Sequence, residues 1–168
     1  MRNAITLLGA CALLAACGQG GGGGGASAPA APPPPELTAA EKAALVASLP
    51  APYNTADIEH GKSEFAICKS CHTIVPGGAN MTGPNLHGVF GRKAGTAANY
   101  NYSDAVKNAG FTWDAAHLDK WLTQPRTFLP GTKMSFAGVK EEKDRIDLIA
   151  YLKVETGYKP PDAAPKQP

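Results

Sequence analysis

Apolar residues recur at helical spacing in the second half of the chain, and this pattern predicts a small helical domain over residues 57–158. Gly61 and Phe65 stand four residues apart and therefore share a face of the first helix. Gly157 is placed to end the last one. The helices are expected at about 56–69, 103–110, 114–123 and 141–156. No alternating pattern of useful length indicates a strand, so we expect an all-α fold.

The N-terminal residues 1–16 have the pattern of an export leader. Arg2 supplies a positive start, and the apolar run over 4–16 is shorter than the roughly 20 residues needed to span a bilayer. The run ends in Leu-Ala-Ala-Cys, which resembles a bacterial lipoprotein signal with Cys17 as the lipidated first residue. An ordinary secretory peptide and a retained, uncleaved anchor are the alternatives.

Residues 17–56 are expected to form a tether. Glycine, alanine and proline dominate its first half, a composition that cannot build a core. Thr38 and Glu41 then have the spacing of a capping box, so a short helix follows, and Pro50 ends it. We interpret this helix as a spacer rather than a docking element, because isolated helices of this length are marginal in water. The tail over 159–168 is expected to be disordered.

The strongest chemical signal is the string Cys-x-x-Cys-His formed by Cys68, Cys71 and His72. Residues three and four apart share a helix face, so both thiols can reach the vinyl groups of one porphyrin while the histidine offers its imidazole to the iron. A redox dithiol would need a βαβ context and a zinc site a second pair of ligands, and neither is visible. We therefore expect one covalently attached haem c per chain.

The second axial ligand is expected to be a methionine. Met81 follows His72 by only nine residues, in a Gly/Pro-rich loop, and is poorly placed to reach the opposite face of the ring. Met134 lies in the turn Pro-Gly-Thr-Lys-Met between two expected helices and can cross to that face. Core filling is the ordinary role of a lone methionine, but the surrounding string favours ligation.

From about 57 to 157 the chain resembles the class I cytochromes c of the mitochondrial and bacterial c2 type. Besides the Cys-x-x-Cys-His string, the stretches that carry this resemblance occur in family order at 82–88, 91–93, 100–103, Trp113, 130–134 and 147–152. The resemblance implies a small cytochrome c fold, in which the N- and C-terminal helices cross over the covalently bound haem. It also implies His72 and Met134 as the iron ligands.

The family pattern implies further residues around the haem. The Pro84 carbonyl is expected to accept a hydrogen bond from the ligating imidazole, which orients the ring. Arg92, Tyr102 and Trp113 match positions that hydrogen-bond a haem propionate. Thr132 matches a residue near the propionates and the methionine.

Two residues depart from the family pattern. Trp121 stands where mitochondrial relatives have a tyrosine whose hydroxyl reaches the methionine sulfur, and Val106 stands where an asparagine joins a buried water network. These changes concern the redox potential rather than the ligation. Bis-histidine ligation is disfavoured, because two of the remaining histidines fall on expected exposed helix positions and one in a loop that matches the family. They are His60, His117 and His87.

An iron with His and Met ligands has no vacant site, so the resemblance implies a one-electron carrier rather than an enzyme. A cytochrome bc1-type complex is the expected donor and a terminal oxidase the expected acceptor, on the periplasmic side of a bacterial membrane that holds the lipid anchor. A haem peroxidase or small-ligand sensor, which needs an open iron, is the alternative from another class. A dedicated donor to a reductase or peroxidase shares the carrier's chemistry. We expect a monomer with no nucleic-acid partner.

Surface charge indicates only modest electrostatic steering. Residues 57–158 carry 12 Lys and Arg against 11 Asp and Glu, whereas mitochondrial relatives are strongly basic around the exposed haem edge. Four cations occupy or adjoin such positions and are the expected docking residues: Lys69, Arg126, Lys133 and Lys140. A membrane tether would compensate for weak steering by keeping the domain near its partners.

Overall fold

The computed structural model describes residues 36–157, and its regular elements are helical. In chain order they are α1 (Ala39–Ala47), η1 (Tyr53–Thr55), α2 (Ile58–Glu64), η2 (Phe65–Ile67), α3 (Asp104–Lys107), α4 (Ala115–Thr123), α5 (Pro125–Phe128) and α6 (Glu142–Glu155). Within 36–157, the only β pairing is an isolated bridge between Lys93 and Thr112. The expectation of an all-α fold is confirmed.

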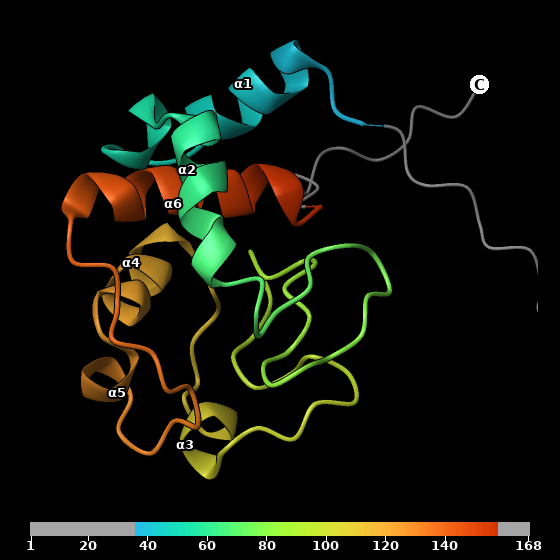
Figure 1. Cartoon of the computed structure of the whole chain (residues 1–168), viewed down its shortest axis with the longest axis vertical. Helices are drawn as coiled ribbons and strands as arrows, with labels where there is room; N and C mark the ends of the chain where they lie inside the picture. The colour runs from blue at the N-terminus through green and yellow to red at the C-terminus, as the bar shows by residue number, and fades with distance from the viewer. Residues whose placement is uncertain (1–35, 158–168) are drawn as a thin grey trace, which may run out of the picture. The chain divides into compact units, whose positions relative to one another are not determined.

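Helices α2 and α6 cross at close range (Figure 1). Gly61 permits this approach, since a Cβ atom there would lie 2.5 Å from the Asp147 carbonyl carbon and 2.8 Å from Tyr151 Cβ. Beside it, the buried Phe65 ring packs on Tyr151 with their centroids 5.4 Å apart. The face that Gly61 and Phe65 share is therefore the surface on which the two helices meet.

Helix α6 is covered on every side along most of its length. Residues 147–154 are all buried, and a run longer than two helical turns includes every face of a helix. Leu148, Ile149 and Ala150 are 0 % exposed. Helices α2, α4 and α1 each contact α6, so this helix forms the centre of the packed domain.

Helix α1 corrects the expected domain boundary. Its capping box forms as predicted, with the Thr38 and Glu41 side chains each accepting from the other's backbone N–H. The interpretation as a spacer was wrong, because Leu45 and Leu49 are buried in the domain core. Lys42 also donates to Glu155 of α6 at 2.9 Å. The packed domain therefore begins well before residue 57, and α1 belongs to it.

Two other elements differ from expectation. The first helix is shorter than 56–69, since α2 gives way to the η2 turn after seven residues. Helix α5 is not among the expected helices; its first residue is Pro125, and proline is well tolerated at the first helical position. The leader 1–16, Cys17 and the tail 159–168 lie outside the described residues. In the part of the chain that the structure describes, no helix is long and apolar enough to cross a bilayer.

Candidate haem cavity

Four residues singled out for their chemistry line one cavity of about 310 Å³. Cys68, Cys71 and His72 follow η2, whereas Met134 comes from the segment between α5 and α6. Aliphatic and aromatic side chains make up much of the remaining wall, among them Phe65, Leu86, Val89, Val106, Leu118, Leu122, Phe136 and Leu152. The fold thus brings two thiols, an imidazole and a thioether to one largely apolar space.

The two cysteines and the histidine sit on a single helical turn. The backbone N–H groups of Cys71 and His72 both donate to the Cys68 carbonyl, at 3.1 and 3.0 Å. Burial raises the pKa of the Cys68 thiol to about 11. A redox dithiol requires the opposite shift, because its reactive form is the thiolate. Burial of the Cys68 thiol in a largely apolar cavity therefore does not favour dithiol chemistry.

His72 is held in one orientation. Its Nδ1 lies 2.7 Å from the Pro84 carbonyl oxygen, and because a carbonyl only accepts, Nδ1 must donate and Nε2 keeps its lone pair for a metal. Burial lowers the pKa of His72, which keeps the imidazole neutral. Gly83 makes room for the ring, since a Cβ there would lie 2.6 Å from Nε2.

Met134 is half-buried on a turn that Thr132 braces. The Thr132 hydroxyl accepts from the Met134 backbone N–H at 3.2 Å. Thr132 is not among the cavity-lining residues of the described segment, so it acts on the methionine turn rather than on the cavity. Trp121 does line the cavity and packs edge-on against Trp113 at 5.4 Å between ring centroids.

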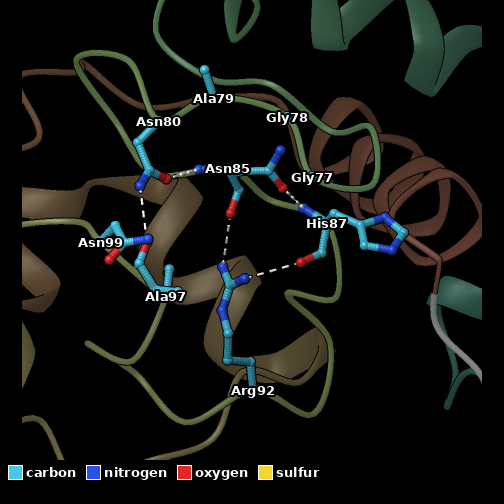
Figure 2. Close-up of a pocket in the computed structure, with 10 residues that line it drawn as sticks. Gly77, Gly78, Ala79, Asn80, Asn85, His87, Arg92, Ala97 and Asn99 are labelled. Carbon is cyan, nitrogen blue, oxygen red and sulfur yellow. Dashed lines mark hydrogen bonds between the residues drawn. The ribbon is translucent and has the colours of Figure 1, made fainter. Parts of the chain in front are cut away.

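Arg92, Tyr102 and Trp113 also line this cavity. Arg92 stands between it and a second hollow of about 480 Å³. Figure 2 shows its guanidinium donating to the carbonyl oxygens of His87 and Asn85, at 3.0 and 3.2 Å. Burial raises the pKa of Tyr102, so its hydroxyl stays a neutral donor.

Ser103 is a cavity residue that we did not single out for a site role. Ser103 directly precedes α3, yet its side chain makes no capping hydrogen bond to that helix. The hydroxyl is buried without a protein partner and the residue lines the cavity. A buried polar group needs a partner, and a haem propionate supplies one. The cavity, its paired thiols and its polar end therefore fit a haem c.

The expected docking residues differ in their surroundings. Of the four, only Lys133 lines the cavity, and its Nζ donates to the Asn101 carbonyl at 2.9 Å. Lys140 donates to the Thr123 carbonyl at 3.4 Å. Lys69 and Arg126 are exposed. Ile67 lines the same cavity although it is 54 % exposed. The wall of the cavity therefore reaches the surface at the apolar Ile67 as well as at the cationic Lys133.

Residues 58–154 match the family model for cytochrome c. The chain belongs to the cytochrome c family. Cytochrome c2 from Rhodoplanes tepidamans is 52% identical over 96 residues, which is 57% of this chain and 90% of that protein. Cytochrome c from Kluyveromyces lactis is 44% identical over 105 residues, 62% of this chain and 96% of that one. The solved structure of cytochrome cH from Methylobacterium extorquens has a TM-score of 0.55 and 47% identity, and the match covers 58% of this chain and 98% of that chain.

Membership of the cytochrome c family confirms the small cytochrome c fold and a covalently bound haem c with its iron. It also supports an electron-carrier role. The matched segment begins at residue 58, so α1 and η1 precede it.

None of the other histidines in the described chain, His60, His87 and His117, lines the cavity.

Proposed function

We propose that the protein is a one-electron carrier whose haem iron is ligated by His72 and Met134. The observation that carries the proposal is that His72 Nε2, left free by the hydrogen bond from Nδ1, and Met134 belong to one cavity. A haem iron held by two protein ligands exchanges single electrons and offers no open position to a substrate. Cys68 and Cys71 would form the thioether bonds that keep the haem in place.

The other cavity residues orient the ligands and satisfy the propionates. Pro84 fixes the His72 ring, and a fixed, neutral imidazole is a stronger ligand than a rotating one. The donors available to the propionates are the side chains of Arg92, Tyr102, Ser103 and Trp113. Buried carboxylates require such partners. Trp121 and Met134 line the same cavity. We expect the Trp121 indole N–H to influence the Met134 thioether as a hydrogen-bond donor.

Met134→Ala tests the ligand assignment. The variant should open the iron, so that the reduced protein binds carbon monoxide rapidly at neutral pH and the midpoint potential falls; axial ligands move haem potentials over about 0.8 V. Met81→Ala is the matched control, because Met81 is 47 % exposed and does not line the cavity. Rapid carbon monoxide binding by the unmodified protein would instead favour a peroxidase or a small-ligand sensor.

We propose that the carrier works on the periplasmic side of a bacterial membrane, anchored by a lipid on Cys17. A cytochrome bc1-type complex would be its donor and a terminal oxidase its acceptor. Lys69, Arg126, Lys133 and Lys140 would contact them. The test is Cys17→Ser: the haem protein should leave the membrane fraction, and continued membrane association after leader cleavage would place the anchor elsewhere. Reduction and oxidation by isolated membrane complexes identify the partners.

A further inference from the structure

A second group of ligand atoms lies at the crossing of α2 and α6, outside the haem cavity. His60 and Glu64 are one turn apart on α2, and Asp144 is on the first turn of α6. His60 Nε2 is 3.8 Å from Glu64 Oε1 and 3.9 Å from Asp144 Oδ1. One ligand atom from each residue lies within 4.8 Å of the other two. None of the three lines the haem cavity.

The imidazole of His60 is turned toward the two carboxylates by a buried residue. Its Nδ1 lies 2.8 Å from Asp147 Oδ2, and the Asp147 side chain is 1 % exposed. A carboxylate only accepts hydrogen bonds, so Nδ1 donates, and Nε2 is the ring nitrogen that faces Glu64 and Asp144 and is left to bind a metal. Histidines that bind metals in proteins are oriented in this way by a carboxylate on the opposite ring nitrogen.

Asp147 is itself firmly placed. It accepts from the Asp57 backbone N–H at 2.9 Å and from Lys143 Nζ at 2.5 Å. Lys143, whose side chain is 70 % exposed, is the cation close to the group, and it pairs with Asp147 rather than with either candidate ligand. The orientation of His60 therefore rests on a buried anchor, whereas Glu64 and Asp144 are partly exposed and free to adjust.

We propose that His60, Glu64 and Asp144 form a Zn²⁺ site that links α2 to α6. One imidazole nitrogen and two carboxylate oxygens are a ligand set that zinc accepts, with Zn–N near 2.1 Å and Zn–O near 2.0–2.2 Å, and a water would fill the fourth position. Tetrahedral ligands at these lengths are about 3.4 Å apart. The two distances from His60 Nε2 to the carboxylate oxygens need to shorten by only about half an ångström to meet that geometry, a small shift for side chains at the surface.

The site would stabilise the fold as well as bind the metal. Its ligands come from two helices that are about 80 residues apart in the chain, and a ligand that binds only the folded state shifts the unfolding equilibrium. Zinc bound at a large excess over its dissociation constant should raise the thermal midpoint of the haem-loaded protein by about 5 °C or more.

Calorimetric titration of the haem-loaded protein with Zn²⁺ at neutral pH tests this proposal, with the thermal midpoint as a second measurement. We expect binding at one site, weakened at least tenfold by His60→Gln, Glu64→Gln or Asp144→Asn, together with loss of the zinc-dependent midpoint shift. Glu59→Gln is the matched control, because Glu59 is on the same helix and its side chain is 84 % exposed. His117→Gln controls for binding at another partly exposed histidine.

Three results would overturn the proposal. The first is a dissociation constant above about 1 mM, and the second is unchanged binding in both carboxylate variants. The third is loss of binding in His117→Gln but not in His60→Gln. An unchanged haem spectrum in each variant shows that the electron-transfer centre is intact, so failure of the zinc site leaves the proposed carrier function untouched.

Discussion

Gly61→Ala places one methyl group at the tightest contact of the fold. The new Cβ would lie 2.5 Å from the Asp147 carbonyl carbon and closer still to its oxygen. These are backbone atoms, so no side-chain rotation relieves the overlap. Ordinary contact at about 3.5 Å requires α2 and α6 to separate by roughly 1 Å, and separation opens gaps beside Phe65.

The size of the effect is the balance of two terms. Alanine favours a helix interior over glycine by about 1 kcal/mol, while overpacking typically costs about 1–3 kcal/mol and more in the worst cases, among which we place an overlap with fixed backbone atoms. We therefore expect a net loss of about 2–3 kcal/mol in the free energy of unfolding. For a domain of this size the thermal midpoint should fall by about 10–20 °C.

Guanidinium denaturation of the haem-loaded protein, followed by far-ultraviolet circular dichroism, measures this loss. Ser63→Ala is the control on α2, because Ser63 is exposed and its hydroxyl donates to the Glu59 carbonyl within the same helix. If Gly61→Ala lowers the free energy of unfolding by less than 1 kcal/mol and leaves the denaturant slope unchanged, the reasoning is refuted. It would mean that the helices separate without cost, and the crossing would not limit stability.

Two further predictions concern α1 and α6. Leu45→Ala should cost about 2–3 kcal/mol, because Leu45 is buried in the core, whereas Lys42→Ala should cost less than about 0.5 kcal/mol; equal, negligible effects in denaturant titrations would mean that α1 does not dock. Burial lowers the pKa of Lys153 from its ordinary 10.5 to about 8. The unfolded chain therefore binds more protons between these values, and stability should rise with pH from about 8 to 10.5. Lys153→Met should add about 1–2 kcal/mol at pH 7 and flatten that rise, measured by denaturation of the reduced protein at pH 7 and 9.5; an unchanged pH profile would show that Lys153 is not the group responsible.

Local sequence patterns predicted the features that form between residues close together in the chain. The Cys-x-x-Cys-His turn needs only one helical turn to assemble, and the Gly61–Phe65 face needs only helical spacing. The position of α1 depends on contacts with residues about a hundred positions away, and local helix propensity carries no information on them. A signal was nevertheless present: residues 146–154 contain apolar side chains on every face of α6, and such a helix needs cover on all sides. That cover could have been sought in the apolar positions of the segment interpreted as a spacer.

Ser103 shows a different limit of sequence interpretation. A serine at the start of a helix has a sufficient explanation as a cap, so nothing in the sequence indicates that its hydroxyl faces a cavity. Only the buried and unpartnered oxygen reveals the second role. Residues whose local function is plausible are therefore the ones whose role in a site is most easily missed.

The position of α1 also bears on how the carrier meets its partners. Helix α1 packs on one side of α6, and the segments that line the haem cavity lie on the other (Figure 1). No residue of α1 or η1 lines the cavity. A partner that approaches Ile67 and Lys133 at the cavity wall therefore need not displace the N-terminal extension. Because α1 is docked on the domain through Leu45, Val46 and the following Leu49, the proposed tether must supply its reach from the residues before α1. Its effective concentration near a membrane partner would accordingly be set by a shorter link than the full segment 17–56, and shorter flexible links give higher effective concentrations as long as they span the distance. With the lipid anchor proposed above, such a link, rather than a strongly basic surface, would bring this nearly neutral domain to its partners.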